Sequence, residues 1–182
     1  MVGAALGLGA LALQPDVAGA RQLIRLTAWT SLLAFLLAHM ASTCWRLWPG
    51  AVSRLLLAQR RSLGLLMFSS HLLHAMGIAV LAGWADPALR AQLTPWPNRV
   101  IGGSGYLALF AMAATSWDGA QRWLGWARWH RLHSVCGWVI WLVYLLAMLK
   151  RAPAMPGYGV AALALLALGA LKVWAQRMTR SA

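Results

Sequence analysis

The chain has 182 residues, of which 61% are hydrophobic and 10% charged, and its mean hydropathy is +0.64. Soluble domains carry about 25% charged residues, so this composition predicts an integral membrane protein with no length left for a soluble catalytic domain. Sixteen Lys and Arg stand against three Asp and Glu. The basic residues are scattered between apolar runs and form no single stripe, so membrane lipid is the expected partner and nucleic acid is not.

The apolar runs predict an all-α fold, a bundle of about six transmembrane helices in a single domain over residues 1–182. Five runs are long enough to span a bilayer, and each is bounded by Arg, Pro, Asp or Gly. The first run has about fourteen residues and is too short to span upright, so whether it spans as a tilted helix stays open. In chain order the runs cover residues 1–14, 26–45, 62–84, 99–117, 132–150 and 157–175.

Alternation of these spans places the segments 46–61 and 118–131 and the C-terminal tail on one side of the membrane. That side carries ten Lys and Arg against six on the other, and basic segments remain on the cytoplasmic side. We therefore expect these three segments in the cytoplasm. The ten residues are Arg46, Arg54, Arg60, Arg61, Arg122, Arg128, Arg131, Lys172, Arg177 and Arg180.

The chain offers little acid–base or phosphate-binding chemistry. Asp16, Asp86 and Asp118 fall in expected loops or at span ends, too dispersed to form a carboxylate pair. The glycine-rich stretch at 101–106, Ile-Gly-Gly-Ser-Gly-Tyr, lies inside an expected span. There it predicts close helix packing and not a phosphate cradle.

The five histidines are the informative residues, because a histidine in hydrocarbon is costly and usually marks function. Four lie within expected spans, and His130 falls at the membrane interface. His71 and His74 occupy neighbouring positions on one helical face, as do His130 and His133 if their helix starts early enough. A haem with two axial imidazoles needs one histidine from each of two facing helices, and a pair drawn from these two segments meets that need.

Two stretches resemble the ferric reductase-like transmembrane domain family, most closely the haem-binding membrane subunits of the methionine sulfoxide reductase system. They are RRSLGLLMFSSHLLH, from Arg60 to His74, and TSWDGAQRWLGWARWHRLH, from Thr115 to His133. The first matches the family's Arg-Arg-x-Leu-Gly-Leu opening and the histidine that follows it. The second matches a Thr-Ser turn, a Leu-Gly and a Trp-x-x-Leu-His element. The similarity covers roughly residues 26–175.

The resemblance implies a b-type haem whose iron is bound by His74 and His133. Family members carry a further ligand thirteen residues after the second histidine, where this chain has Leu146. One haem is therefore expected, and a second stays open. His71, one helical turn closer to the cytoplasm than His74, and His39, on the preceding helix, stay open as alternative ligands.

Arginine forms bidentate charge-assisted hydrogen bonds with carboxylates, so the arginines near these histidines are candidate partners of the haem propionates. Arg131 is the first choice because it lies close in sequence to His133, and Arg61 is the second. Arg60 and Arg128 are further candidates. All four also fit a plain role as cytoplasmic anchors.

The resemblance implies an electron-transfer subunit of an oxidoreductase in a bacterial-type inner (plasma) membrane. Two imidazoles on iron leave no open position for oxygen or substrate, so such a haem passes single electrons. Electrons would come from quinol or a cytoplasmic flavin source, and a periplasmic reductase would receive them. The chain has no flavin- or nicotinamide-binding domain, so we expect it to depend on partners and not to act as a self-contained enzyme. A flavin or quinone as a further cofactor stays open.

Two other classes of function remain. One is a membrane structural or assembly protein of the same fold without a cofactor, which the leucine at position 146 makes conceivable. The other is a small transporter or metal permease that uses His39, His71 and His74 as transient ligands. A visible cofactor spectrum separates the haem protein from both.

Overall fold

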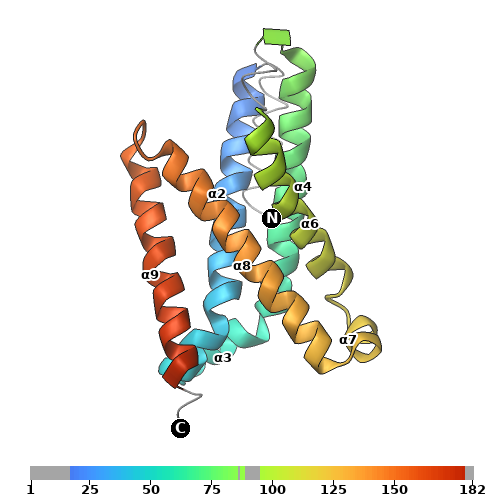
Figure 1. Cartoon of the computed structure of the whole chain (residues 1–182), viewed down its shortest axis with the longest axis vertical. Helices are drawn as coiled ribbons and strands as arrows, with labels where there is room; N and C mark the ends of the chain where they lie inside the picture. Colours follow the sequence, from blue (N-terminus) through green and yellow to red (C-terminus); the bar gives the residue numbers. More distant parts are fainter. Residues whose placement is uncertain (1–16, 86, 89–94, 179–182) are drawn as a thin grey trace. The chain divides into compact units, whose positions relative to one another are not determined.

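A computed structural model describes residues 17–85, 87–88 and 95–178 of the chain (Figure 1). Over these residues the protein is all-helical, with seven helices and no strand. The helices are α2 (Val17–Leu47), α3 (Ala51–Ala58), α4 (Arg60–Trp84), α6 (Trp96–Ala114), α7 (Asp118–Leu124), α8 (Trp126–Arg151) and α9 (Pro156–Met178).

Four of these helices, α2, α4, α8 and α9, are each long and apolar enough to cross a membrane. Helices α6 and α7 meet the same test as a pair, bent by 98° at the break between them. The protein is therefore a multi-pass helical membrane protein with four or five spans in the described residues. Four of the five long apolar runs lie wholly in one helix, and the run at 99–117 extends three residues past the end of α6 at Ala114. The short run at 1–14 lies outside the described residues, so a sixth span stays a prediction.

The helices extend further than the apolar runs because polar residues at the membrane surface can remain helical. Helix α2 starts at Val17 instead of 26, and it includes Arg21 and Arg25, whose side chains are exposed. The segment 46–61, expected as a loop, contains α3 and the start of α4. The segment 118–131 contains α7 and the first turns of α8, so His130 and His133 lie on one helix as the early start requires.

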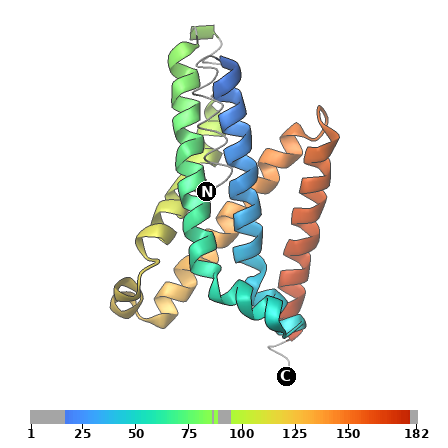
Figure 2. The same cartoon turned by 180° about the vertical axis from the view of Figure 1, so that it is seen from behind.

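The helices divide into two units. Of the described residues, the first contains 17–36 and those within 61–100, and the second contains 37–60 and 101–178. In the first unit α2 and α4 lie side by side, as Figures 1 and 2 both show.

Small polar residues join α2 and α4 within the first unit. Ser70 Oγ donates a hydrogen bond to the Thr27 carbonyl oxygen at 2.9 Å, and Ser31 Oγ donates one to the Met67 carbonyl oxygen at 3.2 Å. The side chains of Thr27, Ser31 and Ser70 are almost completely buried. Further along α4, a Cβ on Gly77 would lie 2.9 Å from Ile24 Cγ1, so glycine is required for this approach. Close packing over small residues and hydrogen bonds across helices are the usual means of helix association in lipid.

In the second unit α8 and α9 are antiparallel neighbours joined by a short turn (Figure 2). Trp141 Nε1 donates a hydrogen bond to the Leu165 carbonyl oxygen at 3.0 Å, and its ring fills the space that a Cβ on Gly169 would occupy. Helix α6 packs on α8 through Gly105, whose Cβ position lies 3.3 Å from Val143. The glycine-rich stretch at 101–106 thus serves helix packing through Gly105, while the positions at 102 and 103 face open space.

Candidate functional site: histidines of the two units

Helix α4 carries two stacked histidines in the first unit. The ring centroids of His71 and His74 lie 5.0 Å apart at an interplanar angle of 20°, and both side chains are half-buried. His71 Nδ1 lies 3.0 Å from Ser31 Oγ, and His74 Nδ1 lies 2.9 Å from the Ile24 carbonyl oxygen. Both hydrogen bonds cross to α2, so this helix orients both rings.

These hydrogen bonds determine which ring nitrogen carries the proton. A carbonyl oxygen only accepts, so His74 Nδ1 must donate and the lone pair of the neutral ring is on Nε2. The Ser31 hydroxyl gives its one proton to Met67, so it accepts from His71 Nδ1 and leaves the lone pair of that ring on Nε2 as well. An Nδ1–H held by a backbone carbonyl or a hydroxyl is the second-shell arrangement that prepares a histidine to bind metal through Nε2. His71 and His74 are thus chemically fit to bind iron.

His133 in the second unit makes its hydrogen bond through the other ring nitrogen, Nε2. Its Nε2 lies 2.9 Å from Thr115 Oγ1, at the end of α6. The Thr115 hydroxyl donates to the Ala111 carbonyl oxygen at 2.7 Å, so His133 Nε2 is the donor and Nδ1 carries the lone pair. Ligation of iron through Nε2 therefore requires His133 to give up its bond with Thr115.

Trp129 fixes the same corner between α6 and α8. Its ring stacks on His133 with centroids 4.2 Å apart, and its Nε1 donates to the Thr115 carbonyl oxygen at 2.8 Å. The Trp-x-x-x-His spacing places the two rings one turn apart on the same face of α8. His130, by contrast, is exposed and stands beside Trp126, as expected for an interfacial residue.

His39, at the end of α2, belongs to the second unit and packs against α8. Its side chain is 8% exposed. A Cβ on Gly137 would lie 3.4 Å from His39 Nδ1, and the His39 ring stands edge-on to Trp138 with centroids 5.5 Å apart. Gly137 follows His133 by one helical turn. The second unit thus brings a buried histidine from α2 close to the helix that carries His133.

Lys172 is the functional candidate that the sequence analysis missed. It was counted among the cytoplasmic basic residues, but it lies inside α9, is 7% exposed and donates a hydrogen bond from Nζ to the His39 carbonyl oxygen at 2.5 Å. The signal was present in the sequence: this lysine interrupts an apolar run within a span expected at 157–175, and a charge at such a place is costly.

Arg60, in the first turn of α4, is a cation that influences several residues of the second unit. Its charge acts on His39, His133 and Lys172, and the charge of Arg46 acts on Lys172 as well. The arginines chosen first as propionate partners, Arg131 and Arg61, are not the ones whose charges act on these three residues. Both are exposed, and they belong to different units: Arg61 to the first and Arg131 to the second. His74 and His133 likewise belong to different units.

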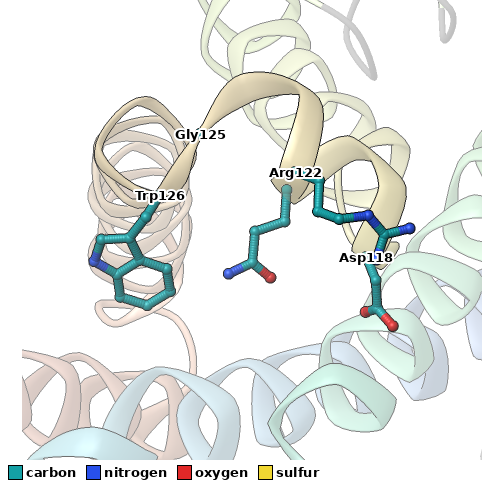
Figure 3. Close-up of a pocket in the computed structure, with 5 residues that line it drawn as sticks. Asp118, Arg122, Gly125 and Trp126 are labelled. Atoms are coloured by element: carbon teal, nitrogen blue, oxygen red, sulfur yellow. The ribbon is translucent and has the colours of Figure 1, made fainter.

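Two surface pockets lie in the second unit. One, of about 450 Å³, is lined by residues of α7 and the start of α8, and Figure 3 shows Asp118 and Arg122 on one side of it and the Trp126 ring on the other. The other, of about 400 Å³, is an apolar groove between α8 and α9 that contains Trp138, Trp141 and Trp174. Neither pocket is lined by a histidine. Among the described residues, no group of three or more His, Cys, Asp or Glu is arranged to hold a metal ion. A haem iron needs only two protein ligands, because the porphyrin supplies four.

Comparison of the chain with protein-family models, with curated proteins and with solved structures gave no match. The functional assignment therefore depends on the chemistry of the histidines and on the two motifs that carry the family resemblance.

Proposed function

We propose that the protein is a b-type haem membrane subunit that passes electrons across or within a bacterial inner membrane to a partner reductase. The observation that carries this proposal is the hydrogen bond from His74 Nδ1 to the Ile24 carbonyl oxygen. It places the lone pair of a membrane-embedded imidazole on Nε2, the nitrogen that binds iron in haem proteins. This is the tautomer that ligation through Nε2 requires, and the same hydrogen bond also joins α4 to α2.

His74 and His133 are the proposed axial ligands, because they stand at the motif positions that resemble the family's. His71, which has the same tautomer as His74, and His39, which shares a unit with His133, are the alternative ligands. When bound, the haem supplies one-electron redox chemistry at an iron with no open position. The protein's part is to hold the imidazoles: Ile24 and Ser31 fix the rings on α4, and Trp129 fixes the ring on α8.

The partners follow from the resemblance and from composition. A quinol or a cytoplasmic flavin source is the proposed donor and a periplasmic reductase the proposed acceptor. We expect one haem per chain, because position 146 holds leucine and not a further ligand.

The absorption spectrum of detergent-purified protein, oxidised and dithionite-reduced, tests the proposal together with a pyridine haemochrome count. We expect a sharp reduced α-band and one b haem per chain. His74→Ala and His133→Ala should each abolish haem incorporation, while His130→Ala, which changes an exposed histidine on the same helix as His133, should retain it. Normal haem content in a ligand variant would overturn that ligand assignment.

A cofactor-less membrane scaffold is the second candidate, and one observation favours it. His133 presents Nε2 to Thr115, which is a complete structural role without any iron. A colourless protein that cannot be reconstituted with hemin would remove the haem assignment for all of the histidines and favour this second candidate.

A further inference from the structure

Lys172 is a buried cation, and no carboxylate of the described residues is bonded to it. Its side chain is 7% exposed, and its described hydrogen bond goes to a carbonyl oxygen, which carries no net charge. Asp118 is the single acidic residue in the described part of the chain, and it is exposed on α7. An ammonium removed from water is strongly destabilising unless an anion compensates it.

The neighbours of Lys172 increase this need for an anion. The charges of Arg60 and Arg46 act on it, so at least three cations share this end of the second unit. An ammonium group has three donors, and the His39 carbonyl oxygen takes one of them. Hydrogen-bond donors and positive charge thus accumulate beside His39 at a buried position on α9. Lys172 is six residues from the end of α9 at Met178, which corresponds to about 9 Å along the helix.

We infer that Lys172 binds a carboxylate of the cofactor, as the buried partner of a haem propionate. The inference rests on the proposed haem function and assigns to Lys172 a role that the exposed Arg131 and Arg61 were expected to fill. A carboxylate that reaches Lys172 would neutralise a charge that no described residue compensates. It would thereby couple cofactor binding to the packing of α9 against the end of α2.

Titration of the detergent-purified apoprotein with hemin and with hemin dimethyl ester tests this role, with binding followed by Soret absorbance. The ester keeps the iron and the ring but has no ionisable propionates. In the wild-type protein we expect the ester to bind about 10- to 100-fold more weakly than hemin, the range for a lost charge-assisted hydrogen bond. In Lys172→Met hemin should bind as weakly as the ester does, and Lys172→Arg should keep the preference for hemin.

Lys150→Met is the matched control, because the second lysine of the chain is exposed at the far end of α8. It should behave as the wild type. Thermal unfolding of apo Lys172→Met should be unchanged or shifted upward, since the substitution removes a buried charge. If Lys172→Met keeps the wild-type preference for hemin over the ester, the role of Lys172 is overturned while the haem function stands. If the wild-type protein binds neither compound, the haem function itself fails, and the role of Lys172 with it.

Discussion

Single hydrogen bonds decide what each histidine can do. His71 and His74 both donate from Nδ1 and keep the Nε2 lone pair, whereas His133 donates from Nε2 to Thr115. The sequence identifies all three as intramembrane histidines, but it cannot show their tautomers. Those depend on acceptors 18 to 50 residues away, namely Ile24, Ser31 and Thr115.

Removal of the Thr115 hydroxyl tests whether His133 leaves its protein partner to bind iron. Thr115→Val takes away the acceptor of His133 Nε2, so the apoprotein should lose about 1 kcal/mol of stability in thermal unfolding. The haem content should not fall, because an Nε2 bound to iron no longer needs Thr115. Ser116→Ala is the control, since the described hydrogen bond of the Ser116 hydroxyl goes to the Met112 carbonyl oxygen in the last turn of α6 and not to a histidine. A folded Thr115→Val protein without haem would show that Thr115 orients His133 for ligation through Nδ1.

At the scale of helices, the apolar runs predicted where the spans lie but not how far the helices extend. Length and hydrophobicity are local properties, and four of the runs, at 26–45, 62–84, 132–150 and 157–175, lie in helices long and apolar enough to span a membrane. The run at 99–117 corresponds to the bent pair α6 and α7, which counts as a fifth span only if the pair is one span. The extra turns at Val17 and Trp126 are polar and are stabilised by backbone hydrogen bonds at the membrane surface, which a hydropathy pattern does not register. Lys172 was misjudged for a related reason. Its burial is produced by α9 packing on the end of α2, a contact between residues 133 positions apart.

The contact between α2 and α4 positions His74, so its disruption should affect both stability and cofactor. A Cβ on Gly77 would lie 2.9 Å from Ile24 Cγ1, and the carbonyl of Ile24 holds His74. Gly77→Leu should therefore lower the free energy of unfolding by about 1–3 kcal/mol through overpacking and reduce haem content. Gly64→Leu is the matched control on the same helix, because no atom lies within 4 Å of its Cβ position. Thermal unfolding and the haemochrome count measure both effects, and equal behaviour of the two variants would contradict this account.

At the scale of the whole molecule, the direction of electron flow depends on how the chain is oriented in the membrane. With the buried Lys172 left out, nine Lys and Arg on one side against six on the other predict that the α6–α8 corner and the end of α9 lie in the cytoplasm. His133 lies seven residues into α8, about 10 Å from the start of that helix at Trp126. His74 lies thirteen residues beyond Arg61, about 20 Å along α4 from the same membrane face. In this orientation His133 is the ligand nearer the cytoplasmic donor.

Labelling with a membrane-impermeant maleimide measures that orientation. In a Cys44→Ala/Cys136→Ala background, single cysteines are placed at Gln59, between α3 and α4, at Ala127, at the start of α8, and at Ala154, in the turn before α9. All three positions are exposed. Ala154→Cys should react in intact spheroplasts, and the other two only after lysis, because basic segments are retained in the cytoplasm. The reverse pattern would place His133 at the periplasmic face, and the donor would then have to be periplasmic and the reductase cytoplasmic.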